Sequence, residues 1–68
     1  MDITIRDEFI KLGQALKLAG VVDDGVEAKY AIQEGRVKVN GETDLRRGRK
    51  VYEGDVISFG NEEIKVTR

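Results

Sequence analysis

The chain has 68 residues, contains no cysteine, histidine or proline, and carries a formal net charge of −1. A chain of this length forms a single domain, here residues 1–68, and buries only about 60% of the surface that its unfolded form exposes. The composition excludes a zinc site of Cys and His, a disulfide scaffold, a Cys nucleophile and a histidine general base. No signal peptide or membrane-spanning run is recognised, so we expect a cytoplasmic protein.

The positive charges are concentrated in the middle of the chain. Residues 29–50 contain seven Lys or Arg residues against three acidic ones, which gives this segment a charge of +4 and leaves −5 for the rest. The densest part is Arg46-Arg47-Gly48-Arg49-Lys50. Because the distribution of charge matters more than its sum, a nearly neutral chain can still present a basic surface to a polyanion.

The first third of the chain predicts a strand and a helix. Alternation of Ile3 and Ile5 is typical of a short strand over residues 2–6. Apolar residues then recur at helical spacing, which predicts a helix over residues 11–19 that ends at Gly20. Gly13 falls in the first turn, where it weakens the helix, and we expect close approach of another backbone to explain it.

A second helix is predicted to begin at Asp24. Asp24 followed by Glu27 is a variant of the capping box, and Ala28, Ala31 and Ile32 form one apolar stripe. Gly35 suits the left-handed position that ends a helix. Since two of the three stripe residues are alanine, this helix can lie close to its neighbour.

The second half of the chain predicts strands separated by turns. Val37 and Val39 alternate with Lys38, and Asn40-Gly41 is a strong tight-turn signal. Residues 42–50 are polar and are expected to form a loop, whereas residues 56–59 and 62–67 predict a β-hairpin. The expected order is therefore β, α, α, β, loop, β, β.

Three motifs carry a resemblance to a known family. They are Lys11-Leu12 at the start of the first helix, Val37-Lys38-Val39-Asn40-Gly41, and Val51-Tyr52-Glu53-Gly54-Asp55-Val56-Ile57. At this spacing the chain resembles, over roughly residues 11–59, the RNA-binding domain first named for ribosomal small-subunit protein four, which we call the S-four-type domain. Among stand-alone members it is similar to the YaaA and YbcJ group of short bacterial proteins.

The resemblance implies both a fold and a function. The fold is α+β, the alpha-L motif, with two antiparallel helices packed on a small, mostly antiparallel sheet. The function is binding of structured ribosomal or transfer RNA, and the implied role is in ribosome assembly, with a ribosomal subunit as a partner, or in translation. The chain departs from the family where many members begin the second helix with Ser-Arg, because Asp24-Gly25 keeps the cap but loses the cation.

The candidate RNA-binding residues are all cations. Arginine grips phosphate with a planar fork, and phosphate contacts supply most nucleic-acid affinity. An ordinary solvated loop or helix face is the alternative explanation, and it accounts equally well for Lys11, Gln14 and Lys17 on the first helix. The predicted RNA-binding set is Lys11, Lys29, Arg36, Lys38, Arg46, Arg47, Arg49 and Lys50.

Catalysis is not expected. Asp23-Asp24 and Asp55 are the candidate carboxylates, but Asp24 is explained as a cap and Asp55 as a turn residue. With one serine and no histidine a catalytic triad is impossible. We therefore expect a binding protein with no cofactor, metal, small-molecule substrate or membrane partner. Two alternatives stay open: a protein-interaction module that adds a partner strand to the sheet edge, and an accessory domain acting on an RNA-modifying enzyme.

Overall fold

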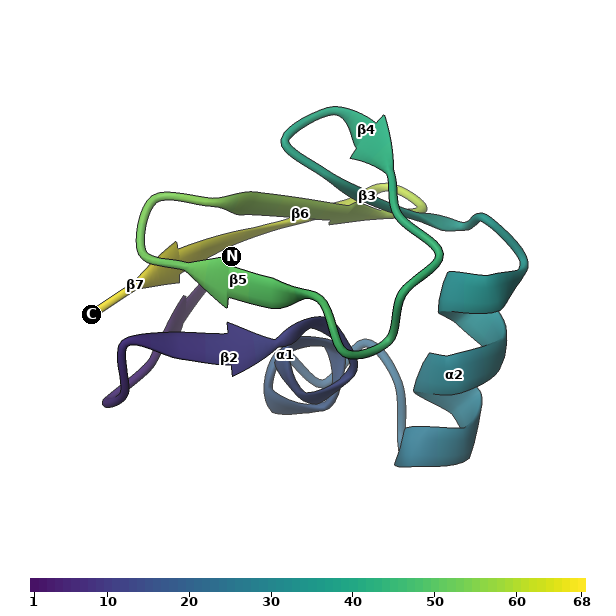
Figure 1. Cartoon of the computed structure of the whole chain (residues 1–68), viewed down its shortest axis with the longest axis horizontal. Coiled ribbons are helices and arrows are strands. Elements are labelled where there is room, and N and C mark those ends of the chain that lie inside the picture. The colour runs from purple at the N-terminus through teal and green to yellow at the C-terminus, as the bar shows by residue number, and fades with distance from the viewer.

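The computed structural model describes all residues from 1 to 68. Figure 1 shows two helices that lie against a twisted sheet, with a short two-stranded ribbon in front of it. In chain order the elements are β1 (Asp2–Thr4), β2 (Phe9–Lys11), α1 (Leu12–Leu18), α2 (Gly25–Gln33), β3 (Val37–Val39), β4 (Glu42–Thr43), β5 (Lys50–Tyr52), β6 (Val56–Phe59) and β7 (Glu62–Thr67). The predicted α+β class is confirmed.

The larger sheet has five strands in the order β1-β7-β6-β3-β4. Its pairings are antiparallel except for β1 with β7, where Ile3 lies opposite Val66 in a parallel register. The predicted hairpin is confirmed as β6 and β7. The second sheet contains only β2 and β5, which pair antiparallel across nearly 40 residues of sequence.

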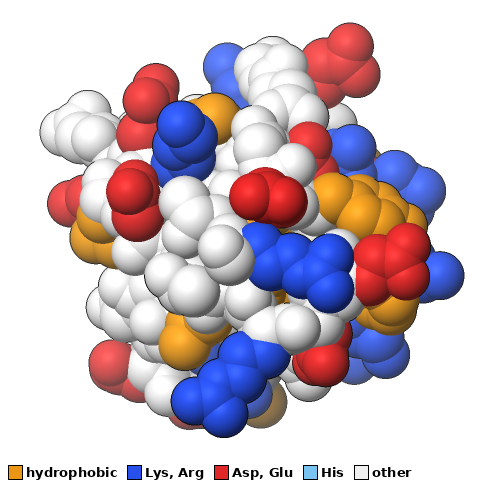
Figure 2. Space-filling model, turned by 90° about the vertical axis from the view of Figure 1, so that its left-hand side faces the viewer, with side chains coloured by type: hydrophobic (Ala, Val, Ile, Leu, Met, Phe, Trp, Pro, Cys, Tyr) orange, Lys and Arg blue, Asp and Glu red, His pale blue; other side chains and the backbone are white.

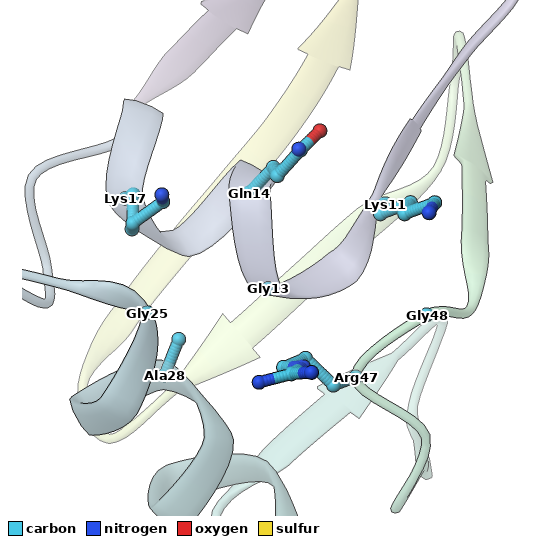
Figure 3. A pocket seen from close by; sticks show the side chains of 8 residues that line it. All are labelled: Lys11, Gly13, Gln14, Lys17, Gly25, Ala28, Arg47 and Gly48. Carbon is cyan, nitrogen blue, oxygen red and sulfur yellow. The ribbon is translucent and has the colours of Figure 1, made fainter.

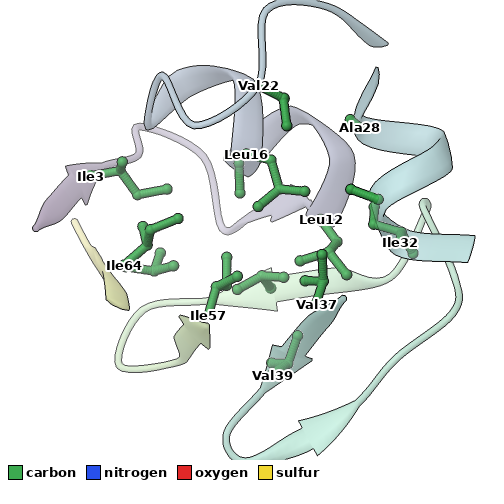
Figure 4. Close-up of a cluster of buried hydrophobic side chains, with 14 of the residues drawn as sticks. Ile3, Leu12, Leu16, Val22, Ala28, Ile32, Val37, Val39, Ile57 and Ile64 are labelled. Atoms are coloured by element: carbon green, nitrogen blue, oxygen red, sulfur yellow. The ribbon is translucent and has the colours of Figure 1, made fainter. Parts of the chain in front are cut away.

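The hydrophobic core lies between the helices and one face of the larger sheet (Figure 4). Fifteen residues form it, and they include Leu12 and Leu16 of α1, Ile32 of α2 and the inward-facing Val37 and Ile57 of the sheet. Alternation along each strand places polar residues on the opposite face, as in the buried–exposed–buried pattern of β3. The sheet therefore has one apolar face covered by helices and one polar face.

The predicted helix ends are confirmed. The Asp24 carboxylate accepts a hydrogen bond from the Glu27 backbone amide at 2.8 Å, and Glu27 Oε2 in turn accepts from the Asp23 amide at 3.3 Å. Gly35 has a φ of +78°, the left-handed conformation that suits the end of a helix. In Figure 1 α1 is viewed nearly end-on while α2 runs up the page beside it.

The predicted tight turn between β3 and β4 is also confirmed. Asn40 and Gly41 both have positive φ values, 53° and 85°. Two consecutive left-handed residues are the requirement of a type I′ hairpin turn, and Asn-Gly is its preferred pair. This turn reverses the chain from β3 into β4 and starts the segment that carries the basic cluster.

Two elements differ from the sequence-based expectation. The strand β2 was not predicted, because three residues are too short for alternation to be recognised and the pairing partner β5 is far away in sequence. Residues 42–50 were expected to be a loop, but both ends of this segment are strands, β4 and the first residue of β5. In addition, β1 ends at Thr4, although the Ile5 amide still bonds to the Thr67 carbonyl at 2.8 Å.

Candidate functional site

A polar groove lies where α1, the beginning of α2 and the loop after β4 meet. We call it the α1–α2 groove, and its volume is about 340 Å³. Three of its lining residues are cations and none is acidic (Figure 3). The lining residues are Lys11, Gly13, Gln14, Lys17, Gly25, Ala28, Arg47 and Gly48. A concave, cationic and polar surface of this kind suits an anionic ligand.

The loop after β4 reaches the groove because it bonds to the first turn of α1. The Leu12 amide donates to the Arg49 carbonyl at 2.8 Å, and the Gly13 amide donates to the Arg47 carbonyl at 3.0 Å. Amides in the first turn of a helix have no partner within the helix, and no side chain caps α1 at Lys11. The loop carbonyls therefore take the role of the missing cap.

Gly13 allows this close approach. A Cβ atom at this position would lie 2.7 Å from Cγ of Arg47, which is too close for two carbon atoms. The Arg47 backbone does approach Gly13, as expected, but the atom nearest to a Cβ at this position belongs to the Arg47 side chain. In Figure 3 the Arg47 side chain extends past Gly13 toward Ala28 of α2, whereas Lys11 points away, toward the strand that follows Gly48. Arg47 thus crosses the groove and Lys11 stands at its rim.

Asp44 holds two of the other arginines. Its carboxylate accepts hydrogen bonds from Nη2 of Arg46 at 2.8 Å, from Nε at 3.1 Å and from the Arg46 backbone amide at 2.9 Å. Nη1 of Arg49 lies 3.3 Å from the same carboxylate. We call Asp44, Arg46 and Arg49 the Asp44 clamp. Because one anion serves two cations, the clamp retains a net charge of +1.

The electrostatics of the clamp follow from this geometry. The Arg46 side-chain hydrogen bonds lower the pKa of Asp44 to about 2, although burial of this carboxylate opposes the shift. Asp44 is 8% exposed, whereas the Arg46 side chain is 73% exposed. The same contacts raise the pKa of Arg46. Asp44 and Arg46 are therefore both charged at neutral pH, and their contacts fix the loop that carries Arg47.

The structure does not gather all predicted RNA-binding cations on one surface. Lys11 and Arg47 meet at the α1–α2 groove, and Arg46 and Arg49 lie beside it in the clamp. Lys50 lies 4.8 Å above the ring of Phe9 on the β2–β5 ribbon. These five residues form one region around the loop of residues 44–49, which we call the basic loop.

The other three predicted residues lie elsewhere. Lys38 alternates with the buried Val37 and Val39, so it is on the polar face of the sheet, opposite the helices. Arg36 is 3.4 Å from Glu34 and 5.0 Å above the ring of Phe59, at the far end of α2. Lys29 is exposed on α2 and is not among the groove residues. The eight predicted residues therefore do not all lie around the α1–α2 groove.

Sequence reasoning missed part of the groove. Gln14 and Lys17 line it with Lys11, at positions i, i+3 and i+6 of the same helical face. Gly25 also lines it, at the position where the S-four-type pattern often has arginine. The spacing of Gln14 and Lys17 relative to Lys11 was visible in the sequence, but it could not be told from an ordinary solvated helix face.

The face on the left of Figure 1 differs from the α1–α2 groove in its distribution of charge. Figure 2 shows that acidic and basic side chains are interleaved there, with hydrophobic atoms scattered between them. No group of three or more carboxylates is arranged to hold a metal ion. None of the helices is long and apolar enough to cross a membrane. In contrast to this face, the α1–α2 groove is lined by three cations and by no carboxylate.

Comparisons with known proteins identify the family to which this sequence is similar. The family model described as "S4 domain" matches residues 3–67. The chain is 49% identical over 65 residues to "Probable ribosome maturation protein RlbA" of Bacillus subtilis, covering 91% of this chain and 92% of that protein. It is 39% identical over 61 residues to "Putative RNA-binding protein YbcJ" of Escherichia coli, covering 90% and 87%.

A solved structure extends the comparison to the fold. The solution structure of YbcJ from E. coli, described as revealing an alpha-L motif involved in RNA binding, superimposes with a TM-score of 0.76 and 32% sequence identity. The match covers 98% of this chain and 86% of that one. The sequence match and the structural match both cover nearly the whole chain.

Proposed function

Because the chain belongs to the S4 domain family, we propose that it binds structured RNA through the α1–α2 groove and the basic loop beside it. The observation that carries this proposal is the composition of the groove. Lys11, Lys17 and Arg47 line a concavity that contains no carboxylate. In a chain of net charge −1, such a surface attracts a polyanion while the rest of the molecule repels it.

The geometry suits recognition of the RNA backbone. Phosphate contacts release condensed counterions, and this release supplies most of the sequence-independent affinity. Arg47 crosses the groove and offers a planar fork, and Lys11 and Lys17 offer point charges on one side of α1. Double-stranded RNA is recognised mostly by shape and by its phosphates and 2′-hydroxyls, which a rigid groove with spaced cations can read.

Ribosomal or transfer RNA is the proposed partner, and ribosome assembly in the cytoplasm is the proposed process. The name of the Bacillus subtilis relative, which refers to ribosome maturation, supports the ribosomal choice. The proposed role is binding without turnover, because the groove contains no serine, threonine, cysteine, carboxylate or histidine. Asp55 and Asp24, the candidate carboxylates, are used in hydrogen bonds to backbone amides.

The test is a filter-binding or anisotropy titration of the purified chain against extracted bacterial ribosomal RNA and, separately, transfer RNA. A variant with Lys17→Ala and Arg47→Ala should bind much more weakly than the wild type. The matched control is Lys38→Ala with Arg36→Ala, which removes the same charge from outside the groove. Equal weakening by both double variants would show that binding is non-specific attraction and would overturn the groove as the site.

A further inference from the structure

The β2–β5 ribbon, formed by Phe9–Lys11 and Lys50–Tyr52, has an outward face with an unusual composition. The register places Phe9 opposite Tyr52, Ile10 opposite Val51, and Lys11 opposite Lys50. Val51 is fully buried and Ile10 packs against the core, so alternation turns the other four residues away from the core. Two aromatic rings and two ammonium groups therefore share one small surface.

The two lysines face each other without a carboxylate between them. Residues directly opposite in an antiparallel pair have Cβ atoms about 4.5–5.5 Å apart, and like charges at this distance are destabilising. Neither Lys11 nor Lys50 takes part in any of the three ion pairs of the molecule. A bound anion between them would relieve this repulsion.

The two aromatic residues extend the same surface. Their ring centroids are 6.0 Å apart with an interplanar angle of 53°, so the rings meet tilted rather than stacked. The Lys50 ammonium covers the Phe9 ring at 4.8 Å, whereas Tyr52 is 43% exposed. Of the two rings, Tyr52 is therefore the one with a face open to a ligand.

We propose that the β2–β5 ribbon is a stacking platform for an unpaired RNA base. The base stacks on Tyr52, and its phosphate lies between Lys11 and Lys50. Lys11 also stands at the rim of the α1–α2 groove, so a strand leaving a helix held in the groove continues directly onto the platform. The inference rests on the proposed function, and it adds that the RNA has a single-stranded nucleotide next to its paired region.

This combination of aromatic rings and cations is what binding of single-stranded nucleic acid requires. Aromatic rings stack on any base, and neighbouring cations follow the backbone. The lysine pair and the aromatic pair lie on the same face of one ladder, on either side of the inward-facing Ile10–Val51 pair. Lys50 already contacts the Phe9 ring, whereas Lys11 makes no ion pair and gives this surface a cation that the aromatic pair does not itself use.

Tyrosine fluorescence tests the contact directly, because the chain has only two tyrosines and no tryptophan. In the Tyr30→Phe variant Tyr52 is the only fluorophore, and in Tyr52→Phe it is Tyr30, which is exposed on α2. Adding a short single-stranded oligoadenylate at low salt should quench the emission of Tyr52 saturably and leave that of Tyr30 unchanged. Unchanged Tyr52 emission, or equal quenching of both tyrosines, overturns the proposal.

Affinity measurements separate the platform from the groove. Tyr52→Leu should weaken oligoadenylate binding by about 5- to 150-fold, the range expected for one stacked base, while Tyr52→Phe binds as the wild type does. Binding of a fully paired RNA duplex should not change in either variant. If Tyr52→Leu binds oligoadenylate normally, the platform is refuted but the proposed function stands. If the wild type binds no ribosomal or transfer RNA, the proposed function itself fails.

Discussion

The side chains of Asn40 and Asp55 bond two turns of the chain to each other. Nδ2 of Asn40 donates to Oδ1 of Asp55 at 3.0 Å, and Oδ1 of Asn40 accepts from the Val56 amide at 2.9 Å. The second carboxylate oxygen of Asp55 accepts from the Tyr52 amide at 2.8 Å. The turn after β3 is thus joined to the turn after β5, which explains physically why Asn-Gly and Gly-Asp occur together in the motifs of this chain.

Replacing Asp55 should therefore destabilise the protein. Asp55→Ala removes the acceptors of the Asn40 and Tyr52 hydrogen bonds, and we expect the free energy of unfolding to fall by about 1–3 kcal/mol. Urea denaturation followed by circular dichroism measures this. Glu53→Ala, in the same turn but without a side-chain hydrogen bond, is the control and should change stability by less than about 0.5 kcal/mol. Equal effects in the two variants would contradict this role of Asp55.

Arg47→Ala should reduce RNA affinity without affecting the fold. The Arg47 carbonyl, which bonds to Gly13, remains in the variant, so stability should change by no more than about 0.5 kcal/mol. Loss of one phosphate contact should weaken RNA binding about tenfold and reduce the slope of log K against log salt by about 1. A titration at several salt concentrations measures both. An unchanged slope would mean that Arg47 does not contact phosphate.

The substitution Gly13→Ala separates the contribution of this position to helix stability from its contribution to RNA binding. Alanine favours the helix by about 0.5–1 kcal/mol over glycine, but its Cβ would lie 2.7 Å from Cγ of Arg47. The Arg47 side chain must then move, so we expect weaker RNA binding with little loss of stability. Thermal unfolding and RNA titration of the same sample decide this. A variant that binds RNA as tightly as the wild type would show that the position of Arg47 is unimportant.

Gly25→Arg should strengthen RNA binding. Gly25 lines the groove, and a Cβ placed on it meets no atom within 4 Å. The S-four-type pattern often has arginine here, so the substitution restores a cation to the groove wall. We expect higher affinity and a salt slope that increases by about 1. The control Gly25→Ala should leave the slope unchanged; if it increases the affinity as much as Gly25→Arg does, the gain comes from the helix and not from the charge.

Because of the Asp44 clamp, we expect the free energy of unfolding to fall as the pH is lowered. The pKa of Asp44 is lowered to about 2 in the folded chain, below its value of 3.8 when unperturbed. A carboxyl whose folded pKa is depressed stabilises the fold above the unfolded pKa, and this contribution disappears as the pH falls from about 4 toward 2. The wild type should therefore lose more stability over this range than Asp44→Asn does. Parallel pH curves in urea denaturation would contradict the prediction.

The elements with local signals were predictable from the sequence, and the pairings between distant segments were not. Asp24, Gly35 and Asn40-Gly41 determine helix ends and a turn through their own backbone and side-chain chemistry, so each was recognised. The strand β2 forms because Phe9–Lys11 pairs with Lys50–Tyr52. Each segment has only three residues, which is too short for an alternation of apolar and polar residues to be recognised. The exposure of Tyr52 on this ribbon also depends on that pairing, so it had no local signal in the sequence.

The candidate site was predicted only in part, because charge in a sequence does not reveal its partner. Arg46 and Arg47 are adjacent and chemically identical, but Asp44 binds one of them and the groove contains the other. Lys38 and Lys11 both precede apolar residues, yet they lie on opposite sides of the sheet and helices. Only the three-dimensional position separates cations that are available to RNA from cations that are already neutralised or remote.

The bonds from Leu12 and Gly13 to the loop have a consequence for how the molecule meets its ligand. A helix of seven residues is not stable by itself, so α1 and the loop that carries Arg47 must become ordered in the same step. The conformational entropy of the loop is consequently lost during folding and not on arrival of a nucleic acid. Association then needs no rearrangement of the main chain, which favours rapid capture and a modest entropic penalty.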